Sequence, residues 1–187
     1  MNRFPHESFI EDLLNVCSSL NQIQVPYMLI GGLAVALWAN PRATIDLDFI
    51  ILLKEEDVNN FRTSLEDTKL KFIGLHFFKL KKIKIVRFSL CTKNIQGLIT
   101  VDLLLADNPF LEDALKRRAS FTLLDQKIFV TTPEDLILLK LMSFRPQDIA
   151  DITNLITTQK NMNFKYLRAQ AKKLKVTQEL KKFLKTS

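Results

Sequence analysis

The chain has 187 residues, enough for one substantial domain or for one domain with a small appendage. Its 47% hydrophobic and 25% charged residues are ordinary for a globular protein, and no window approaches the roughly 18 apolar residues of a membrane span. The first residues carry acids and lack the apolar segment of a signal peptide, so we expect a cytoplasmic protein without membrane contact. Two isolated cysteines and two histidines make a zinc site an unfavourable interpretation.

The net charge of +7 is concentrated in two segments. Residues 160–187 hold nine Lys or Arg against one acid, a balance of +8, and residues 68–101 hold eight Lys or Arg and no acid. Basic stripes suit a polyanion such as RNA or a nucleoside triphosphate, although lysines also simply solubilise a helix face. The tail lysines that we expect to contact RNA are Lys172, Lys173, Lys181 and Lys182.

The hydrophobic pattern predicts a sheet-forming part followed by helices. Residues 5–24 have apolar side chains at helical spacing and predict an amphipathic helix. The segments that follow predict, in chain order, a strand ending in a Gly-Gly turn at 25–32, a helix at 33–40, a strand at 45–53, a helix opening at 54, strands at 71–78, 83–90 and 98–105, a helix at 108–119 and a hairpin at 121–132.

From Thr132 onward the pattern is helical. Thr132 and Pro133 are typical of a helix start, a second helix begins at Pro146, and two basic helices follow. The order β–α–β–α–β–β–β and then helices predicts an α+β fold. We expect a mixed sheet with flanking helices in residues 1–125 and a helical subdomain in residues 126–187.

Two aspartates stand directly in front of an apolar run, residues 49–53, that reads as a core strand. Asp46 and Asp48 are two residues apart, so strand alternation points both side chains to one face. Two carboxylates this close repel each other unless a cation lies between them, and Mg²⁺ prefers such oxygen ligands. The alternative is a pair of acids at the solvated end of a strand.

Asp102 strengthens the metal interpretation. It lies in a later predicted strand where every close neighbour is apolar or Thr, so its carboxylate needs a partner. A metal shared with Asp46 and Asp48 would supply that partner, and three carboxylates on adjacent strands are the usual frame of a two-metal site. We therefore predict a site for two Mg²⁺ or Mn²⁺ ions.

Two of the four glycines, Gly31 and Gly32, stand side by side between a predicted strand and a predicted helix. Backbone amides at a helix N-terminus bind phosphate, although a tight turn alone also requires Gly. The pair comes 14 residues before the Asp-x-Asp motif that starts at Asp46, and the two features together predict a nucleotide site.

The order of these motifs resembles the minimal nucleotidyltransferases of the DNA polymerase beta superfamily, and within it the branch of AbiEii-type abortive-infection toxins. The matching stretches are "IGGLAVAL", "RATIDLD", the lone Asp on a later strand and "TTPEDLILLKLMSFRPQDIADI", over about residues 25–157. The resemblance implies a polymerase-beta-like mixed sheet. The wider superfamily often has Gly-Ser at the glycine pair, whereas this chain has Gly32 at the second position and no Ser hydroxyl there.

The resemblance implies a role for each matched residue. Asp46 and Asp48 would bind both metal ions, and Asp102 would bind the catalytic ion and accept the proton of the attacking hydroxyl. Gly31 and Gly32 would hold the triphosphate through their amides.

Further residues match the family pattern around the nucleotide. Arg42 and Thr44 fall where the family keeps Arg and Thr, and Arg42 would either neutralise phosphate or pair with Asp48. Lys140 matches the family's helix lysine and would contact the β- and γ-phosphates; the alternative is a lysine whose charged end reaches solvent.

The motif that follows this helix contains Arg145, Asp148 and Asp151. Asp151 would hold Lys140 in place. Asp148 lies in the first turn after Pro146, where an acid also stabilises the helix dipole, so a structural role is equally open for both acids.

The expected activity is transfer of a nucleoside monophosphate from a nucleoside triphosphate to an acceptor hydroxyl, with release of pyrophosphate. An RNA 3′ end, especially that of tRNA, is the favoured acceptor, as in the toxin branch, because of the basic tail. The alternatives are a hydroxyl of a partner antitoxin protein, an aminoglycoside-like small molecule, and a catalytically silent module that binds RNA or a partner.

Overall fold

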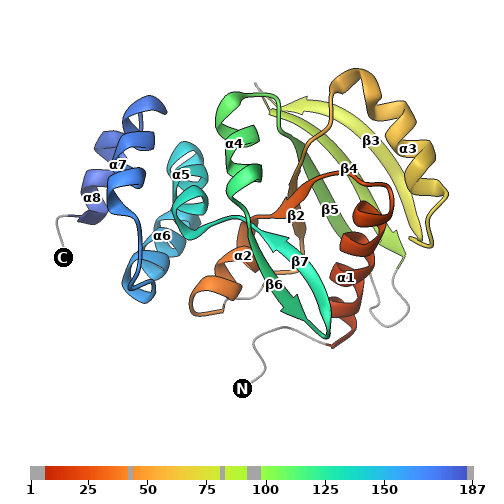
Figure 1. Cartoon of the computed structure of the whole chain (residues 1–187), viewed down its shortest axis with the longest axis horizontal. Coiled ribbons are helices and arrows are strands. Elements are labelled where there is room, and N and C mark those ends of the chain that lie inside the picture. The colour runs from red at the N-terminus through yellow and green to blue at the C-terminus, as the bar shows by residue number, and fades with distance from the viewer. Residues whose placement is uncertain (1–6, 42–43, 81–82, 92–97, 185–187) are drawn as a thin grey trace.

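The structure of the chain, a computed structural model, describes residues 7–41, 44–80, 83–91 and 98–184 (Figure 1). Its described residues form one seven-stranded mixed sheet with the order β3-β4-β5-β2-β1-β7-β6, which confirms the α+β fold. The strands are β1 (Tyr27–Leu29), β2 (Leu47–Ile51), β3 (Phe72–Leu80), β4 (Ile83–Cys91), β5 (Leu98–Leu105), β6 (Ala119–Leu123) and β7 (Gln126–Val130). The α-helices are α1 (Glu7–Gln22), α2 (Gly31–Trp38), α3 (Val58–Glu66), α4 (Pro109–Arg117), α5 (Pro133–Ser143), α6 (Pro146–Thr158), α7 (Phe164–Lys173) and α8 (Thr177–Leu184), with a short 3-10 turn at Glu55–Asp57.

The centre of the sheet is formed by strands that are distant in the sequence. β2 pairs in parallel with β5 and antiparallel with β1, and β1 pairs in parallel with β7. The other neighbours, β3 with β4, β4 with β5 and β6 with β7, are antiparallel. β2 is almost entirely apolar, as expected for a strand that is covered on both faces.

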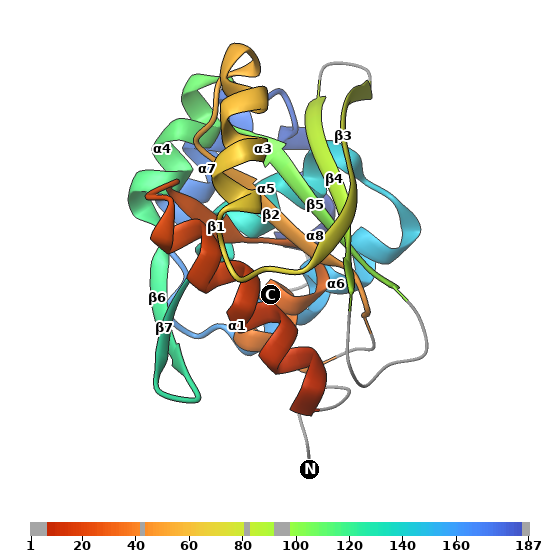
Figure 2. The same ribbon diagram turned by 90° about the vertical axis from the view of Figure 1, so that its right-hand side faces the viewer.

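The two faces of the sheet pack against different helices. On one face Phe49 and Val101 belong to the large core that also contains α1 and α3, and Figure 2 shows α3 above α1 beside β3 and β4. On the other face Met28 and Ile50 pack with Ala114 of α4. Because side chains alternate along a strand, Asp48 shares the face of Ile50, two residues nearer the start of β2.

The C-terminal helices gather at one end of the molecule, away from the β3–β4 edge (Figure 1). The Thr132 hydroxyl accepts a hydrogen bond from the Asp135 backbone N–H at 3.3 Å, so α5 has the N-cap that the sequence predicts. The boundary expected at residue 125 falls at the turn of the β6–β7 hairpin, and β7 pairs with β1. Residues 126–130 therefore lie in the sheet, and the helices begin at Pro133.

A buried carboxylate joins three of the helices. Asp135 is fully buried, accepts hydrogen bonds from both Nη2 and Nε of Arg117 on α4, at 3.0 and 3.2 Å, and accepts a third from the Tyr166 hydroxyl of α7 at 2.6 Å. A buried charge is costly unless it is paired in this way. The network fixes α5 relative to α4 and α7 and thereby helps to position the helix that carries Lys140.

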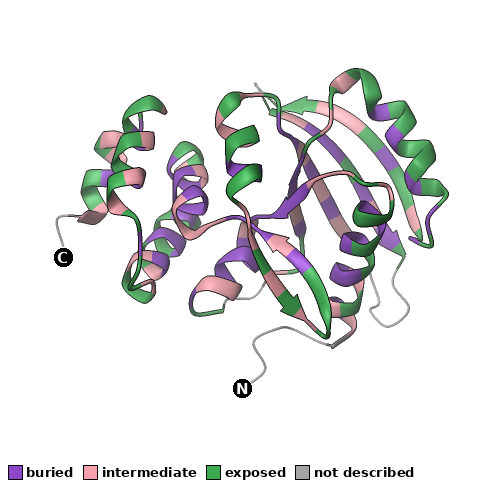
Figure 3. Ribbon diagram, in the orientation of Figure 1, coloured by how far each residue is buried: buried purple, intermediate pink, exposed green. Residues whose placement is uncertain are grey.

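The burial pattern separates a tightly packed centre from an open periphery. Figure 3 shows buried positions along most of β2 and much of α5, and many exposed positions on α7 and α8. Within the described part of the chain, no helix has the length and apolar character needed to cross a membrane.

Candidate active site

Two of the three predicted metal ligands are directly opposite each other in the sheet. Asp48 on β2 pairs in register with Asp102 on β5, and Asp46 precedes the first residue of β2 by one position. Burial, followed by the negative charges of Asp102 and Asp46, raises the pKa of Asp48 to about 6. Asp48 therefore lies within electrostatic range of both Asp102 and Asp46.

The glycine pair lies against this group. The Ile30 N–H donates to the backbone carbonyl of Asp48 at 2.8 Å, and Gly31, with φ of +67°, is the first residue of α2. A Cβ on Gly31 would overlap the Asp48 carboxylate, so both backbone shape and close approach require Gly here. α2 therefore begins at the glycines, two residues earlier than the sequence predicts, and its N-cap, Ile30, has no side-chain acceptor for the first amides.

Asp102 has a protein partner that the sequence analysis missed. Arg87 on β4 is paired in register with Asp102, and its Nε and Nη2 donate to both carboxylate oxygens, each at 2.6 Å. The guanidinium also lies 5.3 Å from the centre of the Phe78 ring. The sequence showed only that a cationic residue occurs within the strand predicted at 83–90. The strand register that places this residue opposite Asp102 cannot be seen in the sequence.

Lys140 lies in a buried ion-pair network between α5 and α6. Its side chain is only 7% exposed, so it does not reach solvent, and its Nζ donates to Asp151 at 2.6 Å and to Asp148 at 3.4 Å. Its charge and that of Arg145 act on Asp48 by lowering its pKa, although burial and the neighbouring carboxylates outweigh them. The positive charges of the network therefore act on Asp48 through space.

Asp148 has the structural role that the sequence left open. Its carboxylate accepts from the backbone N–H of Arg145 at 3.0 Å and completes a capping box at the start of α6. Burial would raise its pKa, but hydrogen bonds from the side chains of Arg145 and Ser143 and from the Arg145 backbone hold it at about 2. Asp148 is thus ionised across the physiological range and helps to hold Lys140.

The remaining predicted residues are less closely connected to the three carboxylates. Arg42 lies outside the described residues, and Thr44 is half-buried two residues before Asp46. The predicted RNA-binding lysines are exposed on α7 and α8. The Nζ of Lys182 lies 4.8 Å from the centre of the Phe144 ring. These four lysines are Lys172, Lys173, Lys181 and Lys182.

The carboxylates fit divalent cations by chemistry, although they are not arranged as a finished coordination sphere. In the part of the chain that is described, no group of three or more His, Cys, Asp or Glu is gathered as a metal cluster. Asp102 is held by Arg87, and Asp46 is exposed. A cation among the three carboxylates would relieve the repulsion that raises the Asp48 pKa, and their hard oxygen donors suit Mg²⁺ or Mn²⁺.

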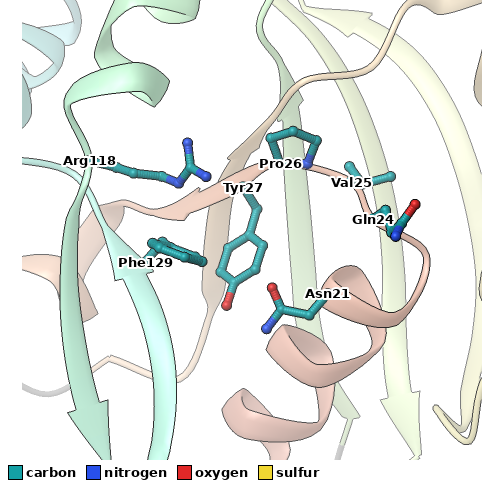
Figure 4. Close-up of a pocket in the computed structure, with 7 residues that line it drawn as sticks. All are labelled: Asn21, Gln24, Val25, Pro26, Tyr27, Arg118 and Phe129. Carbon is teal, nitrogen blue, oxygen red and sulfur yellow. The ribbon is translucent and has the colours of Figure 1, made fainter.

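A small pocket lies at the start of β1, the end that is farther from Gly31 (Figure 4). It has a volume of about 180 Å³ and contains the Arg118 guanidinium, 4.5 Å from the Phe129 ring centre. Its lining residues are Asn21, Gln24, Val25, Pro26, Tyr27, Arg118 and Phe129. None of them is a predicted site residue, and Tyr27 pairs with Ile51, at the other end of β2 from Asp48.

The family "Nucleotidyltransferase of unknown function (DUF6036)" matches residues 8–184 of the chain. The chain belongs to this family. It is therefore a nucleotidyltransferase, as the motif order implies, and the resemblance to the superfamily is confirmed. The AbiEii-type branch stays a prediction. The comparison with curated proteins gave no match.

Solved nucleotidyltransferase structures share the fold of this family member. A nucleotidyltransferase-like antigenic protein from Paracoccidioides brasiliensis is 17% identical, with a TM-score of 0.58 over 95% of this chain and 91% of that one. The antibiotic-resistance factor ANT(2'')-Ia is 12% identical, with a TM-score of 0.57 over 91% and 94%. The lincosamide antibiotic adenylyltransferase LnuA, with lincomycin bound, is 18% identical, with a TM-score of 0.51 over 80% and 97%. At such identities the likeness shows the fold alone.

Proposed function

We propose that this nucleotidyltransferase moves a nucleoside monophosphate from a nucleoside triphosphate to an acceptor hydroxyl, and that Asp46, Asp48 and Asp102 form its reaction centre. The observation that carries the proposal is the in-register pair Asp48 and Asp102 on adjacent parallel strands, with Gly31 packed against Asp48. A carboxylate group next to a helix start whose N-cap has no side-chain acceptor combines sites for divalent cations and for phosphate.

The chemistry is an in-line displacement. The acceptor oxygen forms a bond to the α-phosphorus, the bond from that phosphorus to the bridging oxygen breaks, and pyrophosphate leaves with the electron pair. Two divalent ions held by the three carboxylates would supply charge neutralisation at the attacking and leaving oxygens. Asp102 would accept the proton of the attacking hydroxyl as general base.

The residues around the carboxylates are proposed to hold the triphosphate. The first amides of α2, at Gly31 and Gly32, would bind its oxygens, and Arg42 and Thr44 would extend the site from the segment before Asp46. Lys140 acts through its positive charge near Asp48, and Asp151 and Asp148 fix its position.

An RNA 3′ end, such as that of a tRNA, is the acceptor that we favour, in a toxin–antitoxin or abortive-infection setting in the cytoplasm. The balance of +8 over residues 160–187 supports a polyanionic acceptor. The positive groups that interact with the carboxylates, Arg87, Lys140 and Arg145, support it further.

A small-molecule acceptor is the second candidate, because two proteins that share the fold act on antibiotics or confer resistance to them: LnuA is a lincosamide antibiotic adenylyltransferase and ANT(2'')-Ia is an antibiotic-resistance factor. A polycationic drug would need carboxylates beyond those of the reaction centre. The nearby Asp148 and Asp151 are already paired with Lys140, which disfavours such an acceptor. A hydroxyl of an antitoxin protein is the third candidate.

The test is incubation of the protein with each α-labelled nucleoside triphosphate, Mg²⁺ and total RNA, followed by tracing of the label. We expect label in RNA, and a loss of about 100-fold or more in Asp46→Asn, Asp48→Asn and Asp102→Asn, the scale for removing one preorganised charge-stabilising group. Asp113→Asn removes an exposed carboxylate of α4 and is the matched control. Undiminished transfer by Asp48→Asn contradicts the site, and label in protein or in a small molecule reassigns the acceptor.

A further inference from the structure

Arg87 occupies both oxygens of the carboxylate that the reaction would need. Its Nε and Nη2 each lie 2.6 Å from a different oxygen of Asp102. The pair is not sealed in the core, because the Arg87 side chain is 49% exposed and the Asp102 side chain 18% exposed. The contact therefore has good hydrogen-bond geometry, and its exposure allows solvent or a ligand to replace either partner.

A divalent ion at Asp102 would compete with this guanidinium. The ion and the guanidinium would share one small carboxylate, and two cations at that separation repel each other. Asp102 on β5 has Arg87 on one neighbouring strand and Asp48 on the other. A cation bound between the two aspartates would therefore draw Asp102 away from Arg87. Binding of the ion and the bidentate contact of Arg87 therefore oppose each other.

The surroundings of Arg87 favour a new partner on the same face of the sheet. Asp102 and Asp48 share its cross-strand row, so all three side chains project from one face. The guanidinium already lies over Phe78, which supports its flat surface but offers no acceptor. Its cross-strand neighbour on β3 is His76, which is not an acid. Asp46 and Asp48 also act electrostatically on Arg87, but a cation bound in the loaded site would engage these carboxylates. The phosphate oxygens of the nucleotide would then be the anionic acceptors left for the guanidinium.

We propose that Arg87 is a phosphate-binding residue of the transfer site, which Asp102 holds in the metal-free protein and releases to the nucleoside triphosphate when divalent cations bind. The planar guanidinium with its several N–H donors suits phosphate as well as carboxylate, so the exchange keeps a charged, bidentate partner. The inference rests on the proposed function, since it takes the three carboxylates as the cation site.

The exchange has two consequences of opposite sign. In the metal-free protein Arg87 competes with the cation, so its removal strengthens cation binding. In the presence of nucleotide Arg87 contributes hydrogen bonds to phosphate, so its removal weakens nucleotide binding. A purely structural residue that only orients Asp102 would weaken both when it is removed.

The experiment uses Arg87→Met, which keeps the apolar stem over Phe78 and removes the donors. Mn²⁺ affinity is measured without nucleotide by the electron paramagnetic resonance of free Mn²⁺, and affinity for a non-hydrolysable nucleoside triphosphate is measured by calorimetry at saturating Mn²⁺. We expect tighter Mn²⁺ binding and a fall in nucleotide affinity of about 10-fold or more, the scale of a charged hydrogen bond. Arg87→Lys, with one ammonium, should recover part of the nucleotide affinity.

Arg168→Met is the matched control, because Arg168 is also an exposed arginine over a ring, 5.9 Å from the centre of Phe164, and lies on α7. It should change neither affinity. If Arg87→Met weakens Mn²⁺ binding, or tightens it without loss of nucleotide affinity, the proposal is overturned. If the wild-type protein binds neither Mn²⁺ nor nucleotide, the proposed function fails with it, whereas wild-type binding with unchanged Arg87→Met affinities overturns this inference alone.

Discussion

Replacing Asp48 with Asn should stabilise the metal-free protein, and the gain should grow with pH. Burial and the charges of Asp102 and Asp46 raise the pKa of Asp48 from 3.8 to about 6. The folded state thus holds the Asp48 proton more tightly than the unfolded chain does. The stability that depends on this proton is complete below pH 3.8 and is lost as the pH rises through about 6.

The full shift corresponds to about 3 kcal/mol, and about 2 kcal/mol of it falls between pH 4 and pH 8. Asn has nearly the same shape and cannot ionise, so the variant escapes this loss. The difference in unfolding free energy, Asp48→Asn minus wild type, should therefore increase by about 2 kcal/mol over that range. Saturating Mg²⁺ should reduce or reverse the difference, because the ion stabilises only the protein that binds it.

Urea unfolding of both proteins at several pH values, with a chelator and again with Mg²⁺, measures this difference. Asp113→Asn is the control, since Asp113 is an exposed carboxylate next to Lys116 and should show no comparable gain. A difference between Asp48→Asn and wild type that does not change with pH would refute the reasoning. It would mean that neither burial nor the neighbouring carboxylates raise the pKa of Asp48 in the folded protein.

Three further changes test other parts of the site. Lys140→Met leaves Asp151 and Asp148 buried without their shared cation, so urea unfolding should show a loss of about 3–5 kcal/mol, and unchanged stability would show that the ion pairs contribute nothing. Gly31→Ala forces a Cβ into the Asp48 carboxylate at a positive φ, so both thermal stability and nucleotide affinity should fall; a fully active, equally stable variant would contradict the close approach. Neutralising four tail lysines should weaken RNA binding and flatten its salt dependence by roughly one unit of slope per lost phosphate contact, while nucleotide affinity is unchanged; an unaltered slope would remove the tail from the RNA site. The four changes are Lys172→Gln, Lys173→Gln, Lys181→Gln and Lys182→Gln.

The element order could be read from the sequence because its signals are local. Periodicity marked α1 at residues 5–24, where the helix spans Glu7–Gln22, and the strand predicted at 98–105 is β5. The N-cap at Thr132 was equally visible, since capping involves residues only three apart. The start of α2 was misplaced by two residues, because Gly31 enters the helix with a positive φ and packs against Asp48, a residue distant from it in the sequence.

The sequence by itself determined the α+β class, the nucleotidyltransferase motifs and the residues that are candidates for chemistry. Only the tertiary structure decided which of those residues have protein partners. Arg87 meets Asp102 through the register of β4 with β5, and Lys140 meets Asp151 through the packing of α5 on α6. Such pairings depend on strand register and helix packing between separate segments, and a change of register by one residue turns a side chain to the other face. The chain therefore specifies its charged groups locally, while the fold decides which charges neutralise each other.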